Sequence, residues 1–427
     1  MLLLENLDQN TKVISIQHII EAAENLKGVV THTPLQFNTQ LSDEYGCNIY
    51  LKREDLQIVR SFKLRGAYNK IFSLSSSEKK QGLVCASAGN HAQGVAYACR
   101  KLNIKGIIYM PKTTPAQKIN QVKLFGKEFV EVILIGDLYD DAYKAAMEFC
   151  TKNNSIFVHP FDDEKVIEGQ GTVAKEILDD ADFKIDYLLV PIGGGGLAAG
   201  VISYFTPLSK DTKIIGVEPE GAPSMAVSIK NGYNTELAEI DKFVDGASVK
   251  KVGDKTFAIC KDKLSEIVLV PEGRVCTTIL NLYNREGIVV EPAGALTIAA
   301  LSIIDIEKLK GKNVVCVVSG SNNDIMRTEE IKERSLFYEG LKHYFMIQFP
   351  QRPGALKEFV TDILDPTDDI TYFQFAKKNN REIAPAVVAI EVAKRNDIQR
   401  IKDRLTKNKF VYEYLNDNKA LYTQLIG

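Results

Sequence analysis

Residues 186–205 read DYLLVPIGGGGLAAGVISYF and join an apolar run, a stretch of glycines and a segment of helical composition. The run DYLLVPI is continuous rather than alternating, which is typical of a strand covered on both faces of a parallel sheet. Four glycines let the backbone turn successive N–H groups toward one anion, and a helix N-terminus adds the positive end of its dipole. The stretch lacks the lysine of a nucleotide-triphosphate loop and the spacing of a dinucleotide fingerprint.

This strand–glycine–helix order predicts a phosphate-binding loop, and a closely packed flexible turn is the alternative. The predicted phosphate ligands are consecutive: Gly193, Gly194, Gly195, Gly196 and Leu197. Outward from this loop, apolar runs alternate with helical segments from about residue 50 to 320, so we expect an α/β domain with parallel strands. The other predicted strands are LVCAS (83–87), GIIYM (106–110), FVEVILI (129–135), IFVHP (156–160), KIIGVE (213–218) and NVVCVVS (313–319).

The pattern changes after Ser319. A charged stretch over 326–341 predicts a helix and a linker, and the residues that follow alternate strand and helix in the order βαββαβ, the ferredoxin-like α+β arrangement. Pro353 suits the first turn of the first of these helices, because the donor that proline lacks has no partner there. We predict a main domain over 1–330, a linker over 331–341, a small domain over 342–416 and a tail over 417–427.

Composition excludes several classes of protein. The 427 residues carry a net charge of −2, which gives no reason to expect nucleic acid or an anionic membrane as a partner. No apolar run approaches the roughly 20 residues of a membrane span, and the first ten residues do not form a secretory signal. Seven scattered cysteines without a CxxC pair indicate free thiols in a reducing compartment, and five histidines without metal-ligand spacing predict no metal site.

Three further motifs contain residues suited to chemistry. SFKLRGA (61–67) places Lys63 beside an aromatic residue; a surface cation is the ordinary interpretation, and a partly buried Schiff-base amine is the functional one. SAGNH (87–91) ends one strand and begins a helix, so it predicts either a carboxylate site or a plain helix cap by Asn90. SGSN (319–322) follows the last long strand. It predicts either a plain turn or a hydroxyl group directed at a ligand beyond the carboxyl ends of the strands.

Together, SFKLRGA, SAGNHAQG, GGGGL and the strand ending in SGSN resemble, in order and spacing, the pyridoxal-phosphate enzymes of the tryptophan-synthase-β type, and within them the threonine dehydratases. FPQRPGAL (349–356) resembles the start of the ACT-like regulatory domain of biosynthetic threonine dehydratases. The resemblance implies a two-lobed catalytic domain with pyridoxal 5'-phosphate on Lys63 and one ACT-like domain. It implies further cofactor contacts from the phosphate loop, Gly193 to Leu197, from Asn90 to the ring hydroxyl and from Ser319 to the ring nitrogen. It assigns the substrate carboxylate to Ser87, Ala88, Gly89, Asn90 and His91.

By the same resemblance, we expect β-elimination that converts L-threonine to 2-oxobutanoate and ammonia in the first step of isoleucine biosynthesis, with L-serine as a second substrate. Isoleucine is the expected inhibitor and valine its antagonist, in a cytoplasmic homotetramer. Ala88 stands where related serine racemases carry a serine, and Ser224 stands where some relatives carry a metal-binding aspartate after Glu218 and Ala222. Racemisation and a divalent ion are therefore disfavoured. Glu291, in EPAGA, is either an active-site carboxylate or a helix-start residue.

Three alternatives remain at this point. One is a catabolic serine or threonine dehydratase, and another is a β-replacement enzyme on the same scaffold. A sensor of amino acids without catalytic activity is the third, although it would not need the four motifs to be intact.

Overall fold

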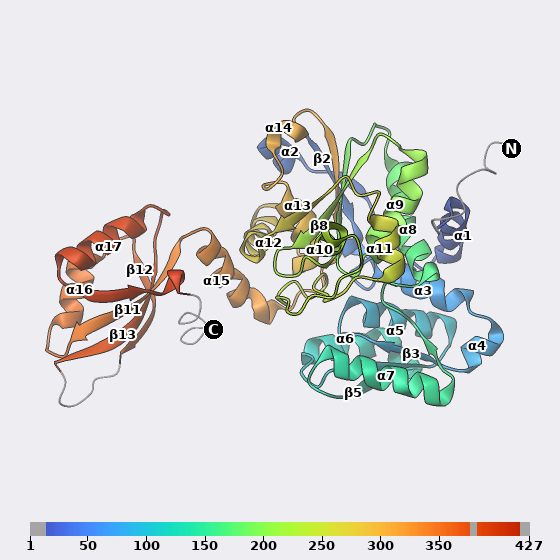
Figure 1. Ribbon diagram of the computed structural model, residues 1–427, viewed down its shortest axis with the longest axis horizontal. Helices are drawn as coiled ribbons and strands as arrows, with labels where there is room; N and C mark the ends of the chain where they lie inside the picture. The colour runs from blue at the N-terminus through green and yellow to red at the C-terminus, as the bar shows by residue number, and fades with distance from the viewer. Residues whose placement is uncertain (1–13, 376–381, 419–427) are drawn as a thin grey trace. The chain divides into compact units, whose positions relative to one another are not determined.

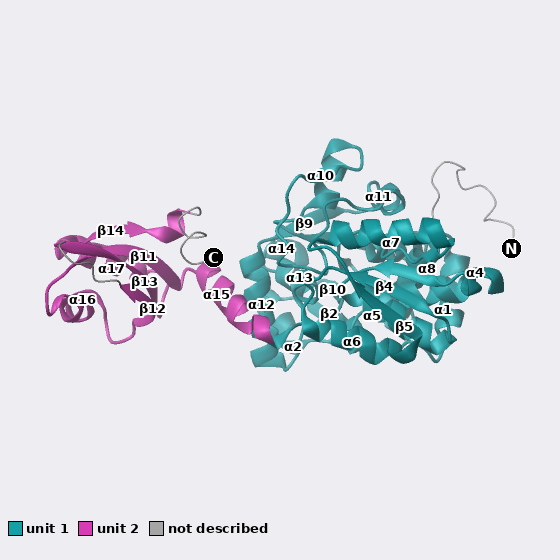
Figure 2. Cartoon of the chain, turned by 90° about the horizontal axis from the view of Figure 1, so that it is seen from below, with its two compact units in different colours: residues 1–325 teal, residues 326–427 magenta. Residues whose placement is uncertain are grey.

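The computed structural model describes residues 14–375 and 382–418 (Figure 1). The chain divides into two compact units, residues 1–325 and 326–427 (Figure 2). Each unit has its own hydrophobic core. The finer division into a linker and a small domain stays a prediction, and the predicted tail lies largely outside the described residues.

The first unit contains two sheets, as the two-lobed expectation requires. The larger has six strands in the order β1-β2-β10-β7-β8-β9, all parallel except the β1–β2 pair. Its strands are β1 (Leu35–Phe37), β2 (Asn48–Arg53), β7 (Tyr187–Pro191), β8 (Lys213–Pro219), β9 (Glu266–Val270) and β10 (Asn313–Val318). The smaller sheet is parallel, in the order β5-β4-β3-β6. Its strands are β3 (Leu83–Ala86), β4 (Gly106–Met110), β5 (Val130–Leu134) and β6 (Ile156–Phe157).

Helices cover both sheets of this unit. The smaller sheet packs α3, α5 and α6 against one face and α7 against the other. The larger sheet packs α8 and α9 into its main core, and α13 lies against β7, β8, β9 and β10. The helices of the smaller lobe are α3 (Lys63–Ser73), α4 (Ser76–Lys80), α5 (Asn90–Leu102), α6 (Ala116–Gly126) and α7 (Tyr139–Asn153). Those of the larger lobe are α1 (Ile16–Leu26), α2 (Thr39–Tyr45), α8 (Glu164–Asp180), α9 (Gly196–Leu208), α10 (Ser224–Asn231), α11 (Asp254–Cys260), α12 (Glu272–Glu286), α13 (Pro292–Ala300) and α14 (Ile306–Leu309).

Every strand predicted in this unit is present. Parallel pairing buries most residues of β3, β4, β7, β8 and β10, whereas β5 and β6 at the edges of the smaller sheet are only partly buried. The sequence prediction missed β1, β2 and β9. Strand β2 reads NIYLKR and carries two charges, so it lacks the apolar run that identified the others. The segment predicted as a strand over 156–160 pairs only at Ile156 and Phe157, and its remaining residues form a loop.

The second unit begins with α15 (Thr328–Tyr338) and continues in the predicted order βαββαβ. Its antiparallel sheet has the order β12-β13-β11-β14 and packs α16 and α17 on one face over an apolar core. These elements are β11 (Lys342–Pro350), α16 (Ala355–Ile363), β12 (Asp369–Phe375), β13 (Ile383–Glu391), α17 (Asp397–Lys407) and β14 (Val411–Tyr414). The ferredoxin-like prediction for this region is therefore confirmed.

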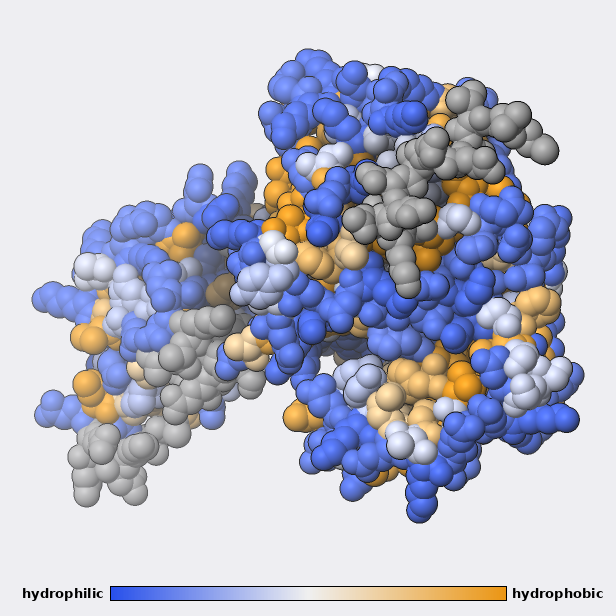
Figure 3. Space-filling model, turned by 45° about the vertical axis from the view of Figure 1, so that its right-hand side comes forward, coloured by the Kyte–Doolittle hydropathy of each residue, from blue (hydrophilic) through white to orange (hydrophobic). Residues whose placement is uncertain are grey.

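Within the described residues, no helix is long and apolar enough to cross a membrane. Figure 3 shows a face on which hydrophilic side chains predominate, with smaller apolar patches between them. Scattered apolar side chains are normal on a protein surface.

Candidate active site

The predicted motifs lie at strand ends and helix starts. The glycine loop follows β7 and opens α9, SAGNH follows β3 and opens α5, and SGSN follows β10. Ligands of open parallel sheets bind beyond the carboxyl ends of the strands. Direct contacts join the motifs, because the Phe62 N–H donates to the Ser319 carbonyl at 3.2 Å and the Asn322 amide donates to the Asn90 side-chain oxygen.

Lys63 is the first residue of α3, and its side chain is partly buried. Its Nζ donates to the carbonyl oxygen of Pro160 at 2.9 Å. Burial lowers the pKa of the Lys63 amine to about 8, although the negative charge of Glu291 opposes that shift. A lysine with a lowered pKa supplies more of the neutral, nucleophilic amine near neutral pH than a surface lysine does.

Asn90 is held from two sides. Its Nδ2 donates to Oε1 of Glu291 at 2.6 Å, and its Oδ1 accepts from Asn322, whose Nδ2 also donates to the Val59 carbonyl. Glu291 is both the N-cap residue of α13 and a buried carboxylate in this cluster, so the structure combines the two alternatives left open for it. Burial, with a further contribution from Asp245, raises the pKa of Glu291 to about 7.

The glycine loop has no room for side chains. A Cβ on Gly194 would lie 2.3 Å from the ring of Phe161, and one on Gly193 would lie 2.9 Å from the Ala247 backbone. Gly195 has a φ of +89°, which side-chain-bearing residues rarely adopt. The backbone itself therefore forms the surface of this loop, and Gly196 and Leu197 begin α9 directly behind it.

Ser319 is buried at the end of β10 and lies beside the segment that leads to Lys63. Its neighbour Gly320 forms a β-bridge with Ser61. The Ser61 hydroxyl is also buried, and it has no hydrogen-bond partner among the described residues. The bridge fixes Ser319 and Lys63 on adjacent segments.

The loop from Ser87 to His91 presents backbone rather than side chains. Gly89 is the N-cap of α5 and no side chain caps this helix, so its first N–H groups suit an anion. Ala88 has no side-chain donor, and the Gly89 N–H donates a hydrogen bond to the Ser87 hydroxyl oxygen. His91 Nε2 lies 2.8 Å from the Val158 carbonyl and must donate to it, because a carbonyl only accepts. Burial lowers the pKa of His91 to about 3, so its other nitrogen is an acceptor and cannot bind a carboxylate.

A cluster of buried ion pairs holds the first turn of α3, which begins at Lys63. The Arg65 guanidinium pairs with Glu54 at 2.7 Å and with Glu176 at 2.7 Å, and Lys52 pairs with Glu176 at 2.6 Å. Arg65 and Lys52 are fully buried. Sequence reasoning did not identify this cluster, because its members come from three separate parts of the chain, residues 52–54, 65 and 176.

Glu218 does not sit in a group of metal ligands. Its carboxylate accepts the backbone N–H groups of Met225 and Ala226, both at 2.8 Å, and burial raises its pKa to about 8. The described part of the chain contains no cluster of three or more histidine, cysteine or acidic side chains suited to a metal ion.

Comparison with known proteins identifies the family. A model described as "Pyridoxal-phosphate dependent enzyme" matches residues 26–320, and one described as "C-terminal regulatory domain of Threonine dehydratase" matches residues 333–425. A protein named biosynthetic L-threonine dehydratase IlvA from Halalkalibacterium halodurans is 58% identical over 97% of this chain and 99% of that protein. The protein of the same name from Bacillus subtilis is 54% identical over 98% of this chain and 99% of that protein.

This chain belongs to the biosynthetic threonine dehydratase family. A solved structure of processed threonine deaminase isoform 2 from Solanum lycopersicum superposes with a TM-score of 0.71, at 39% identity, over 76% of this chain and 91% of that one. The family depends on pyridoxal phosphate, and the residues present suit that cofactor. The glycine loop is a backbone cradle that any Cβ would fill. Lys63 is an amine of lowered pKa that donates to Pro160, the residue before the Phe161 that packs against this loop.

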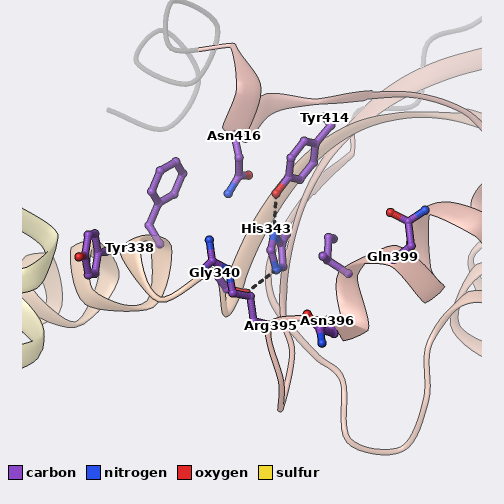
Figure 4. Close-up of a pocket in the computed structure, with 10 residues that line it drawn as sticks. Tyr338, Gly340, His343, Arg395, Asn396, Gln399, Tyr414 and Asn416 are labelled. Atoms are coloured by element: carbon purple, nitrogen blue, oxygen red, sulfur yellow. Dashed lines mark hydrogen bonds between the residues drawn. The ribbon is translucent and has the colours of Figure 1, made fainter.

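The second unit matches the family's regulatory domain and contains a pocket of about 480 Å³ (Figure 4). Its lining includes one cation and no carboxylate: Phe337, Tyr338, Gly340, His343, Arg395, Asn396, Ile398, Gln399, Tyr414 and Asn416. His343 lies at its base, where Nε2 donates to the Gly340 carbonyl at 3.0 Å and Nδ1 accepts from the Tyr414 hydroxyl at 2.7 Å. Burial lowers the pKa of His343 to about 4, so this ring is neutral near pH 7. Among the described residues that line the pocket, Arg395 is therefore the only charged group.

Proposed function

We propose that this protein converts L-threonine to 2-oxobutanoate and ammonia, by dehydration and then hydrolysis of the dehydrated product, in the first step of isoleucine biosynthesis. The observation that carries the proposal is the match to biosynthetic L-threonine dehydratases across both units at 50% identity or more. Hydrogen bonds join three of the four motifs, and the neighbouring residues Pro160 and Phe161 contact Lys63 and the glycine loop, which supports the same reaction. L-Serine, which differs by one methyl group, is the proposed second substrate.

Bound pyridoxal phosphate supplies an electron sink that acidifies the substrate Cα–H bond. In our proposal Lys63 would hold the cofactor through its Nζ, and the same Nζ, when free, would remove the Cα proton of the bound substrate. A positioned base of this kind typically contributes about 10²–10⁴-fold. The Lys63 ammonium formed in this step would pass the proton to the β-hydroxyl, which leaves as water. The released enamine tautomerises and takes up one water molecule to give 2-oxobutanoate and ammonia. Threonine is thereby converted without an external oxidant or reductant.

The remaining residues of the proposed site bind the cofactor and orient the substrate. Residues 193–197 bind the phosphate through backbone N–H groups, and Asn90 contacts the ring hydroxyl. Ser319 is neutral, so it contacts the ring nitrogen without forcing its protonation, which disfavours transamination. The uncapped start of α5 receives the substrate carboxylate through backbone N–H groups.

For regulation, we propose that isoleucine inhibits the enzyme by binding the pocket of the second unit, with valine as its antagonist. Arg395 suits the effector carboxylate, as does the start of α17, which no side chain caps. Phe337 and Ile398 suit a branched aliphatic chain. A ligand that prefers one of two arrangements of the protein shifts activity without touching the active site.

We also propose a cytoplasmic homotetramer. The seven cysteines are buried and none forms a disulfide bond, which suits a reducing compartment. Edge strand β12 exposes Tyr372, Phe373 and Phe375, which suits pairing between subunits. Light scattering of the purified protein tests the assembly, and a monomer at assay concentration would contradict it.

An assay of 2-oxo acid formation tests the reaction. We expect rapid product from threonine, slower product from serine, no β-replacement of O-acetylserine by a thiol, and a reduced rate with isoleucine. Thioether formation from O-acetylserine at a higher rate than threonine deamination would favour the β-replacement alternative. A pure protein without cofactor absorbance or turnover after incubation with pyridoxal phosphate would favour the sensor alternative.

A further inference from the structure

The segment from Val158 to Asp163 follows β6 and leads into α8. Its carbonyl groups contact two motifs of the candidate site, because Val158 accepts from His91 and Pro160 accepts from Lys63. Within the segment, His159 Nδ1 accepts the backbone N–H groups of Phe161 at 3.3 Å and Asp162 at 2.7 Å. The His159 ring thereby fixes the turn that directs the Asp162 side chain.

Asp162 caps a helix far away in the sequence. Helix α11 begins after Gly253, which has no side chain to cap it. The Asp162 carboxylate takes that role, with Oδ1 accepting from Lys255 N at 2.9 Å and Thr256 N at 3.3 Å, and Oδ2 accepting from Asp254 N at 3.1 Å. A Cβ at Gly253 would lie 2.2 Å from Asp162 Oδ1, so glycine is required for this approach.

The capped end of α11 in turn holds the glycine loop. The Thr256 hydroxyl donates to the Gly194 carbonyl at 2.7 Å, and the Gly253 N–H donates to the same oxygen at 3.2 Å. A carbonyl fixed in this way sets the plane of its peptide bond, and therefore the direction of the following N–H group, which belongs to Gly195. Phe161, the residue before Asp162, packs against Gly194 and Gly196 from the other side.

We propose that Asp162 is a positioning residue for cofactor binding: through α11 it fixes the Gly194 peptide so that the glycine loop presents its N–H groups to the phosphate. The proposal rests on the role proposed above for the glycine loop. Asp162 acts through Thr256 and Gly253 and does not itself contact the phosphate. It differs from an ordinary helix cap in one testable respect, because an ordinary cap would affect stability without discriminating between ligands.

The test compares two ligands that differ only by the phosphate. The full-length protein, freed of cofactor, is titrated with pyridoxal 5'-phosphate and with pyridoxal, and binding is followed by absorbance. Asp162→Ala should weaken binding of the phosphate ester by about ten-fold or more and change binding of pyridoxal by less than about two-fold. Asp162→Asn, which keeps an acceptor oxygen for the helix, should recover much of the loss. Asp305→Ala is the matched control, because Asp305 caps α14 and should alter neither affinity.

A second variant approaches the same bond from its other end. Thr256→Val keeps the side-chain shape and removes the hydroxyl donor, so it should reproduce the selective loss even if Asp162→Ala does not fold. The proposal would be overturned if Thr256→Val, or a folded Asp162→Ala, weakened binding of pyridoxal 5'-phosphate and of pyridoxal equally. It would also be overturned if neither affinity changed. The readout is cofactor affinity, so it stands even if threonine proves not to be the substrate.

Discussion

The side-chain amide of Asn90 donates to the buried carboxylate of Glu291 at 2.6 Å, across 201 residues of sequence. The same carboxylate is the charge that raises the pKa of Lys63 against the effect of burial. Glu291 therefore contacts one predicted cofactor ligand and acts electrostatically on another.

Replacing Glu291 tests this electrostatic link. With a pKa of about 7, Glu291 is largely ionised at pH 8, where Lys63 titrates. Glu291→Gln removes that negative charge, so the pKa of Lys63 should fall below 8 and its neutral amine should appear at lower pH. The rate of Lys63 acylation in cofactor-free protein, measured by mass spectrometry against pH, reports this value. An unchanged or raised midpoint would show that the two groups do not interact.

Lys63→Ala should abolish both threonine turnover and the cofactor absorbance that borohydride traps, because no other amine is proposed to hold the aldehyde. Lys101→Ala changes an exposed lysine on α5 and should leave both unchanged. Substantial turnover by Lys63→Ala would refute the assignment.

Gly194→Ala should weaken cofactor binding by about ten-fold or more, because its Cβ would lie 2.3 Å from the Phe161 ring. Phe161→Ala removes the obstructing ring, so Gly194→Ala should weaken cofactor binding less in a protein that already carries Phe161→Ala. A double-mutant cycle of cofactor affinities measures the coupling. Strict additivity of the two changes would mean that Phe161 does not limit this position.

Arg65→Met should destabilise the protein by about 3–5 kcal/mol, because it leaves the carboxylates of Glu54 and Glu176 buried without their guanidinium partner. Lys184→Ala, in the exposed pair with Asp211, should change stability by less than about 1 kcal/mol. Denaturant unfolding of the full-length protein measures both. A loss for Arg65→Met no larger than for Lys184→Ala would show that the buried cluster contributes little.

The sequence predicts the parallel strands and the βαββαβ module well, because their periodicity is local. It predicts the four motifs because each joins a strand end to distinctive residues. It does not predict the contacts of Asn322 or of the segment around Asp162, since these contacts span up to 263 and 94 residues and leave no local pattern. The charges of β2 concealed that strand for a related reason: Lys52 is acceptable inside the protein only because Glu176 lies beside it.

Arg395→Ala should raise the isoleucine concentration for half-maximal inhibition by about ten-fold or more while leaving uninhibited turnover unchanged. It removes the cation that lines the pocket of the second unit and suits the effector carboxylate. The neighbouring Lys394 is exposed and does not line the pocket, so Lys394→Ala is the matched control and should be inhibited as before. Rates of 2-oxobutanoate formation across an isoleucine series give both values. Inhibition of Arg395→Ala at the original concentration would place the effector elsewhere, whereas a wild-type enzyme that isoleucine does not inhibit would remove the regulatory proposal and leave the catalytic one intact.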